Sequence, residues 1–133
     1  MGTGNMIRLF DILKEITDSV QYSNPNFEKE WMEAKRYPEF KKLGKTKWVE
    51  LAKDGYVTKL SKIKSVLSNV DLDFDSLEEP KKQRFEQSFE KGIIELPIVV
   101  KFGKNEYDLV AGNTRIAGLV KYNINPTIWV VEL

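Results

Sequence analysis

The residues best suited to bind a charged ligand lie in the turn Gly112-Asn113-Thr114-Arg115. The turn follows the stretch 107–111, an imperfectly alternating segment that we expect to be a strand, and it opens the stretch 114–122, whose apolar residues recur at helical spacing. The first N–H groups of a helix have no partner within the helix, and the helix dipole favours an anion beside them. Arg115 has the wrong charge for that dipole unless an anion lies next to it. We therefore interpret the turn as a site for a phosphate or carboxylate group.

A purely structural alternative accounts for the same residues. Arg115 would then pair with Asp108 or Glu106, and Gly112 would only permit a left-handed turn. Asn113 or Thr114 would cap the helix that follows. Residue types alone do not choose between these two interpretations.

The segments around the turn predict a strand, a hairpin, a second strand, a helix and a last strand. The stretches 96–102 and 107–111 are rich in β-formers and are separated by Gly103-Lys104-Asn105, which suits a hairpin. Asn123 and Pro126 end the helix, and residues 127–131 are typical of a strand. Gly112 is thus placed where a strand ends and a helix begins.

The order of these features resembles the ParB/sulfiredoxin superfamily, in which a proline-led strand, a strand ending in glycine and a G-x-x-R box follow one another. Here they are the strand led by Pro97, the strand 107–111 and the box from Gly112 to Arg115, and the resemblance covers about residues 56–133. It implies an α+β fold, a small ParB/sulfiredoxin-like domain with a mixed sheet, preceded by a helical extension over residues 1–55.

The resemblance also implies that Gly112, Asn113, Thr114 and Arg115 hold the phosphates of a nucleotide, ATP or CTP with Mg²⁺, for phosphoryl transfer or hydrolysis. The chain has no Cys and no His, which excludes sulfiredoxin chemistry. ParB proteins have a glutamate and further arginines in the box, where this chain has Asn113 and a single Arg115. The alternative is a DNA-associated or partner-binding module, or a ParB-like nuclease, without nucleotide chemistry.

Without histidine, acid/base and metal chemistry would fall to carboxylates. We consider Asp108 and Glu95 as catalytic residues of the turn. Asp71 and Asp73 alternate with apolar residues, so they could present their carboxylates on one side of an extended chain as ligands of a divalent cation. The competing interpretation is a solvated turn in which Asp75 caps the next helix.

The overall charge gives no field that would attract nucleic acid, because 21 basic residues oppose 20 acidic ones. A local patch could still do so, since cations can hold a phosphate backbone and rings can stack on bases. The candidate contacts are Lys41, Lys42, Lys45, Lys47 and Trp48. The other interpretation of this half is a helical cap on the α/β domain, which could also contact a protein partner or a second copy.

The first half of the chain predicts three helices. Apolar residues at helical spacing place the first over about residues 6–20. A second would begin at Asn24-Pro25 and end near Pro38, and a third would be capped by Thr46.

The middle of the chain predicts a strand from Tyr56 that runs into a short helix. Asp75 would cap the next helix with the help of Glu78, and Gly92 would end it. No apolar run approaches 18 residues and no leader is visible, so we expect a cytoplasmic protein that does not contact a membrane.

Overall fold

The computed structural model describes residues 20–133, and the predicted helix at 6–20 lies outside them except for its last residue. The fold is α+β with a mixed sheet, which confirms the predicted class. None of the helices in this part of the chain is long and apolar enough to cross a membrane. The elements are β1 (Gln21–Ser23), α2 (Trp31–Ala34), α3 (Pro38–Leu43), α4 (Lys45–Lys53), β2 (Tyr56–Lys59), α5 (Leu60–Ile63), the 3-10 turns η1 (Lys64–Val66) and η2 (Phe74–Ser76), α6 (Glu79–Lys91), β3 (Ile93–Glu95), β4 (Ile98–Gly103), β5 (Glu106–Ala111), α7 (Asn113–Lys121) and β6 (Thr127–Glu132).

The main sheet has the strand order β2-β6-β4-β5. Strand β4 pairs antiparallel with β5 and parallel with β6, and β2 pairs antiparallel with β6. The predicted hairpin between β4 and β5 is confirmed, and its turn places Asn105 at a positive φ of 63°. Strands β1 and β3 form a separate parallel pair, which ties the N-terminal part of the described chain to the rest.

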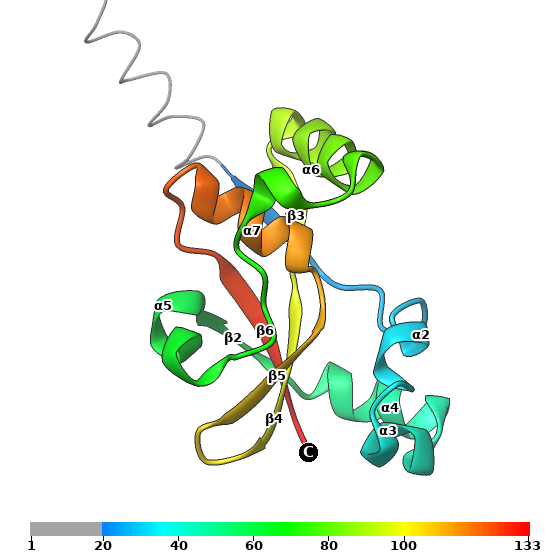
Figure 1. Ribbon diagram of the computed structural model, residues 1–133. Coiled ribbons are helices and arrows are strands. Elements are labelled where there is room, and N and C mark those ends of the chain that lie inside the picture. Colours follow the sequence, from blue (N-terminus) through cyan, green and yellow to red (C-terminus); the bar gives the residue numbers. More distant parts are fainter. Residues whose placement is uncertain (1–19) are drawn as a thin grey trace, which may run out of the picture.

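One face of the main sheet is covered by α2, α3 and α4, which lie away from α6 and α7 (Figure 1). Phe40 and Trp48 from these helices are fully buried in one cluster with Ile98 and Val100 of β4. Of the segment predicted as an extension over residues 1–55, the described part from residue 20 therefore shares a core with the sheet.

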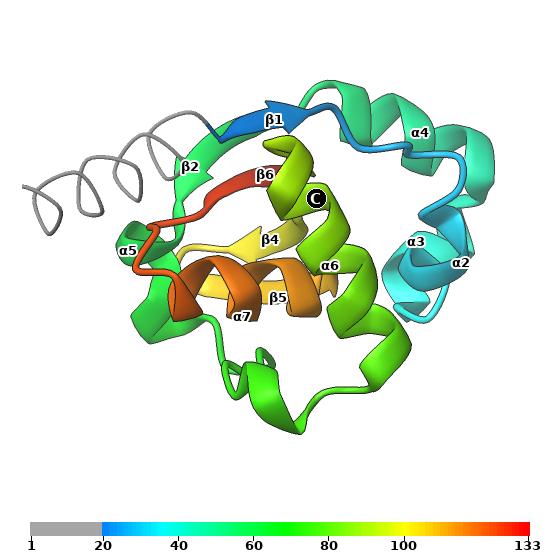
Figure 2. The same cartoon turned by 90° about the horizontal axis from the view of Figure 1, so that it is seen from above.

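Alternate residues of β4 and β5 point to opposite sides of the sheet. The side chains on the second face are covered by α5 and α7. Val99 and Leu109 pack there against Ile116 of α7. Helix α6 lies alongside α7 (Figure 2). Gly118 makes this approach possible, since a Cβ at that position would lie 2.3 Å from Cε1 of Phe85.

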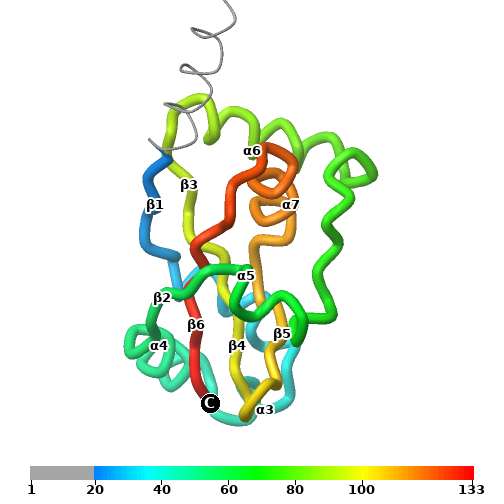
Figure 3. The backbone as a smooth tube through the Cα atoms, turned by 90° about the vertical axis from the view of Figure 1, so that its left-hand side faces the viewer, coloured from blue at the N-terminus to red at the C-terminus, as the bar shows by residue number. Residues whose placement is uncertain are grey.

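The chain between η1 and η2 runs along the free edge of β5, beside β5 and α7 (Figure 3). Leu67 forms a parallel bridge with Tyr107, and the side chain of Asn69 hydrogen-bonds to the backbone of Leu109. This segment covers an edge strand that would otherwise expose unpaired backbone groups.

Two predicted helix boundaries in the first half, one start and one end, are wrong. The chain from Asn24 to Asn26 is not helical, and α2 begins only at Trp31, after a turn in which Asn26 Oδ1 accepts the Lys29 N–H at 3.1 Å. Pro38 begins α3 instead of ending a helix, because its fixed φ suits a first helical turn.

Glycine, not a side-chain cap, separates α3 from α4. Gly44 has a φ of 89°, ends α3 and precedes the first residue of α4, so the prediction that Thr46 caps this helix is wrong. The capping box of Asp75 and Glu78 is also wrong. Asp75 lies in η2, where its carboxylate accepts a hydrogen bond from Lys121 Nζ at 2.8 Å.

The later elements follow the predictions closely. β2 runs directly into α5, and Gly92 ends α6 in the left-handed conformation at a φ of 75°. Helix α7 and strand β6 begin and end within one residue of the predicted positions.

Candidate functional site

A cleft of about 900 Å³ lies where the end of β5 and the start of α7 meet α6, the end of β3 and the chain around α2. The four residues of the predicted phosphate turn are all in its wall. Its lining residues are Lys29, Glu30, Glu33, Arg36, Tyr37, Asn69, Lys81, Arg84, Phe85, Ser88, Glu95, Leu109, Val110, Ala111, Gly112, Asn113, Thr114 and Arg115.

Gly112 shapes the turn between β5 and α7. Its φ of 104° is a left-handed conformation that favours glycine, and a Cβ there would lie 2.7 Å from Cβ of Pro97. The Gly112 carbonyl accepts the first helical hydrogen bond, from the Ile116 N–H at 3.0 Å. The N–H groups of Asn113, Thr114 and Arg115 therefore precede the first intrahelical donor of α7.

The side chain of Asn113 has a structural task. Its Oδ1 accepts the N–H of Asp71 at 2.7 Å, and its Nδ2 donates to the Asp71 carbonyl at 3.0 Å. Neither Asn113 nor Thr114 caps α7 through its side chain, so that part of the structural alternative is wrong. These two bonds fix the Asn113 side chain against Asp71, while its backbone N–H lies at the start of α7.

Arg115 is paired with Glu95, the last residue of β3. Its Nη1 donates to Glu95 Oε2 at 2.9 Å and to the Glu95 carbonyl oxygen at 3.1 Å. Arg115 thus has an acidic partner, as the structural alternative predicted, but the partner is neither Asp108 nor Glu106. The pair is partly exposed, with 21% of the Arg115 side chain and 32% of the Glu95 side chain accessible, and it lies in the wall of the cleft.

Glu30 lies close enough to this pair to interact with both of its charges. Burial raises the pKa of the Glu30 carboxyl above its ordinary value of 4.5, Arg115 opposes that rise, and Glu95 adds to it. A carboxylate that the sequence analysis did not single out therefore lies beside the Arg115–Glu95 pair.

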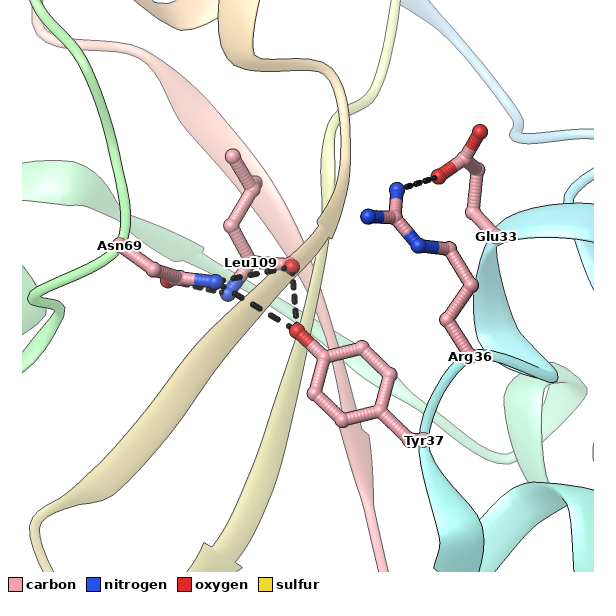
Figure 4. A network of polar contacts seen from close by, with 5 residues as sticks. All are labelled: Glu33, Arg36, Tyr37, Asn69 and Leu109. Carbon is pink, nitrogen blue, oxygen red and sulfur yellow. Dashed lines mark hydrogen bonds and ion pairs between the residues drawn. The ribbon is translucent and has the colours of Figure 1, made fainter.

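A polar network holds the side of the cleft formed by β5 (Figure 4). The Tyr37 hydroxyl donates to the Leu109 carbonyl at 2.7 Å, and Asn69 Nδ2 donates to the same carbonyl at 3.2 Å. Asn69 Oδ1 accepts the Leu109 N–H at 2.8 Å, so this side-chain amide pairs with the strand as a backbone peptide would. Burial and the charge of Asp108 raise the pKa of Tyr37, which keeps its hydroxyl a donor.

Arg36 and Glu33 lie near Tyr37 and form an exposed ion pair, with 3.0 Å between Arg36 Nη1 and Glu33 Oε2 (Figure 4). Across the cleft, α6 contributes Lys81, Arg84 and Ser88. Among the lining residues within 20–133, the positive charges exceed the negative ones by two: Lys29, Arg36, Lys81, Arg84 and Arg115 against Glu30, Glu33 and Glu95.

The carboxylates predicted from sequence are only partly brought together. Glu95 lines the cleft. Asp108, which lies on β5 and pairs with Val100 of β4, is not among the lining residues. Asp71 and Asp73 are exposed, and Asp71 Oδ1 accepts the Asp73 N–H at 3.0 Å. Among residues 20–133, no three His, Cys, Asp or Glu side chains gather as metal ligands.

Trp48, the aromatic residue of the predicted nucleic-acid patch, is not on the surface. Trp48 is fully buried and its Nε1 donates to the Phe27 carbonyl at 2.7 Å, so the prediction that it stacks on bases is wrong. Its helical spacing identified an apolar face, and that face packs on the sheet. Lys41, Lys42, Lys45 and Lys47 are exposed but do not line the cleft.

Several cleft residues were not recognised as site residues in the sequence. Lys81, Arg84 and Ser88 recur at helical spacing on α6, which is a signal for one common face. No comparable signal was available for Lys29 and Glu30, because they precede α2 in a turn.

Comparisons with family models, with curated protein sequences and with solved structures gave no match to this chain.

Proposed function

We propose that this chain is a nucleotide-binding domain of the ParB-like type, which holds the phosphates of ATP or CTP at the turn from Gly112 to Arg115. The observation that carries the proposal is that the start of α7 opens into a cleft with an excess of two basic side chains. Unpaired N–H groups and cations together favour a multiply charged anion.

The size of the cleft agrees with this class of ligand. Sites for small molecules and cofactors commonly have volumes of about 300–1,000 Å³, and this cleft has about 900 Å³. Residues 109–111 of β5 form one wall, while the charged residues come from the chain around α2 and from β3, α6 and α7.

The proposed roles follow from position. The N–H groups of Asn113, Thr114 and Arg115 would bind phosphate oxygens, and Lys81 and Arg84 would neutralise further charge from α6. Glu95 is the carboxylate of the cleft that would hold a Mg²⁺ ion brought by the nucleotide, and the ion would neutralise further phosphate charge.

The reaction class that we propose is phosphoryl transfer or hydrolysis. Catalysis of phosphoryl transfer is mostly positioning and charge neutralisation, which requires few specialised side chains. Glu30 replaces Asp108 as the candidate base, because it lies in the cleft and its raised pKa favours proton exchange closer to neutral pH.

Thermal unfolding in the presence of Mg²⁺-ATP and Mg²⁺-CTP tests the proposal. A nucleotide at a hundredfold excess over its dissociation constant should stabilise the fold by about 2.7 kcal/mol. Arg115→Ala should remove that stabilisation. Lys104→Ala, in the exposed hairpin turn, removes the same kind of charge outside the cleft and should keep it. An equal shift in both variants, or no shift with either nucleotide, would contradict the proposal.

A further inference from the structure

The first turn of α7 is held in place from outside the helix. Helix starts are commonly fixed by a side-chain cap, which accepts one of the first free N–H groups. Gly112, at the capping position of α7, has no side chain to do this. The Asn113 amide instead bonds twice to the backbone of Asp71, with Oδ1 at 2.7 Å from the Asp71 nitrogen and Nδ2 at 3.0 Å from its carbonyl oxygen. This contact fixes the turn without using its N–H donors.

Asp71 belongs to residues 67–73, which we call the edge segment because they run along the free edge of β5. The edge segment is also anchored by contacts that do not involve Asn113. The side chain of Asn69 bonds to both backbone groups of Leu109, and the apolar side chains of the segment pack against the core cluster that α5 and α7 share. Asp71 is therefore a fixed support for the start of α7.

A phosphate that binds the first N–H groups of α7 needs these groups to converge on one point. The ends of helices fray, so an uncapped first turn holds such a geometry poorly by itself. Asp71 is not in the wall of the cleft. Release of the Asn113 side chain from Asp71 would thus leave the N–H groups present, and the ligand contacts unchanged in kind, but the turn would no longer be held in the binding geometry.

We propose that Asn113 is a positioning residue, whose side chain attaches the first turn of α7 to the edge segment and so keeps the N–H groups in the geometry that binds phosphate. The inference rests on the proposed phosphate site and gives the Asn113 side chain a role separate from that of its backbone N–H. Coupling between two equilibria is reciprocal. A bound anion must therefore stabilise the Asn113–Asp71 contact by the same factor by which loss of the contact weakens anion binding.

The first measurement is the dissociation constant of Mg²⁺-ATP or Mg²⁺-CTP, whichever binds the wild type more tightly, from the amide signals of residues 114–116 in the ¹⁵N-labelled full chain. Asn113→Ala removes both bonds to Asp71 and keeps the backbone N–H. The dissociation constant should rise about fivefold, the factor that corresponds to one hydrogen bond of typical net strength.

Asn125→Ala is the matched control. The Asn125 amide also joins two segments, with Oδ1 at 3.1 Å from the Ser61 nitrogen and Nδ2 at 2.8 Å from the Ser61 hydroxyl oxygen, and Asn125 does not line the cleft. This variant loses the same kind of contact and should keep the wild-type dissociation constant.

The second measurement is amide hydrogen exchange in the wild type, which reports the coupling without a substitution. The Asp71 N–H is held by the side chain of Asn113, and the Ser61 N–H is held in the same way by Asn125. Saturating nucleotide should slow exchange at Asp71 by about fivefold, the factor found for the dissociation constant, and leave exchange at Ser61 unchanged. A side chain that only stabilised the fold would not make exchange at Asp71 depend on the ligand.

The outcomes separate this inference from the proposed function. The positioning role is overturned by an unchanged dissociation constant in folded Asn113→Ala, by an equal rise in Asn125→Ala, or by nucleotide slowing exchange at Asp71 no more than at Ser61. If Asn113→Ala does not fold, the two exchange rates of the wild type decide. In each of these cases saturable nucleotide binding by the wild type leaves the proposed function standing, and without such binding both fail.

Discussion

Replacement of Asn69 by alanine should destabilise the fold more than its exposed position suggests. The Asn69 side chain provides the partner of the Leu109 N–H, at 2.8 Å, and a second donor to the Leu109 carbonyl, at 3.2 Å. Leu109 is only 9% exposed, so water cannot readily replace these contacts. An unsatisfied buried N–H costs roughly 1–3 kcal/mol. The Leu109 carbonyl still accepts the Tyr37 hydroxyl at 2.7 Å, so the loss of Asn69 costs less at the carbonyl than at the N–H.

Asn69→Ala should therefore lower the free energy of unfolding by about 2–3 kcal/mol. Tyr37→Phe should lower it by only about 1 kcal/mol, because Asn69 still bonds to both the N–H and the carbonyl of Leu109 in that variant. The double variant should cost more than the sum, by about 1 kcal/mol, since only then does the Leu109 carbonyl lose both partners. Urea unfolding measures all three free energies.

Ser68→Ala is the matched control, because Ser68 is the exposed neighbour of Asn69 and its side chain forms no hydrogen bond with residues 20–133. It should change the free energy of unfolding by less than about 0.5 kcal/mol. A cost for Asn69→Ala as small as that of the control would refute the reasoning. So would strictly additive effects of Asn69→Ala and Tyr37→Phe.

Two further substitutions test the packing of α6 on α7 and the charge of Glu30 in the cleft. Gly118→Ala would ordinarily stabilise a helix by about 1 kcal/mol, but the new methyl group would lie 2.3 Å from Phe85, so we expect a net loss of about 1–3 kcal/mol in urea unfolding. A gain in stability would show that α6 does not rest on α7 as described. Glu30→Gln should raise the melting temperature at neutral pH, because a carboxyl whose folded pKa is raised destabilises the fold increasingly as pH rises above its unfolded value of 4.5. Below pH 4.5 the difference from the wild type should vanish, and a difference that is constant with pH in thermal scans would contradict this interpretation.

The C-terminal half could be predicted because its signals are local. Gly112 requires a left-handed turn, Asn105 suits the hairpin, and the β-branched residues of β4 and β6 favour strands whatever packs on them. These features depend on neighbours in the sequence. Their elements therefore appear close to the predicted positions.

The first half was harder because its signals are ambiguous. Pro38 can end one helix or begin the next, and the choice depends on how Phe40 and Trp48 pack on the sheet. The same ambiguity made Trp48 resemble a nucleic-acid contact, since an apolar helical face looks alike in sequence whether it meets bases or a core.

The partners within the site could not be predicted, because they come from distant parts of the chain. Glu95 meets Arg115 only through the packing of β3 near α7, and Asn113 meets Asp71 only because residues 67–71 follow the edge of β5. Sequence identified Arg115 as a cation in need of an anion. The sequence does not indicate which carboxylate pairs with Arg115.

The most direct test of the proposed phosphate site is the response of the backbone amides of residues 113–115 to nucleotide. With Mg²⁺-ATP or Mg²⁺-CTP added to the ¹⁵N-labelled protein, we predict saturable shifts that are largest at Asn113, Thr114 and Arg115, together with the Arg84 side chain across the cleft. Unchanged amide signals at these residues at millimolar nucleotide, or shifts confined to the lysines of α3 and α4, would contradict the central claim.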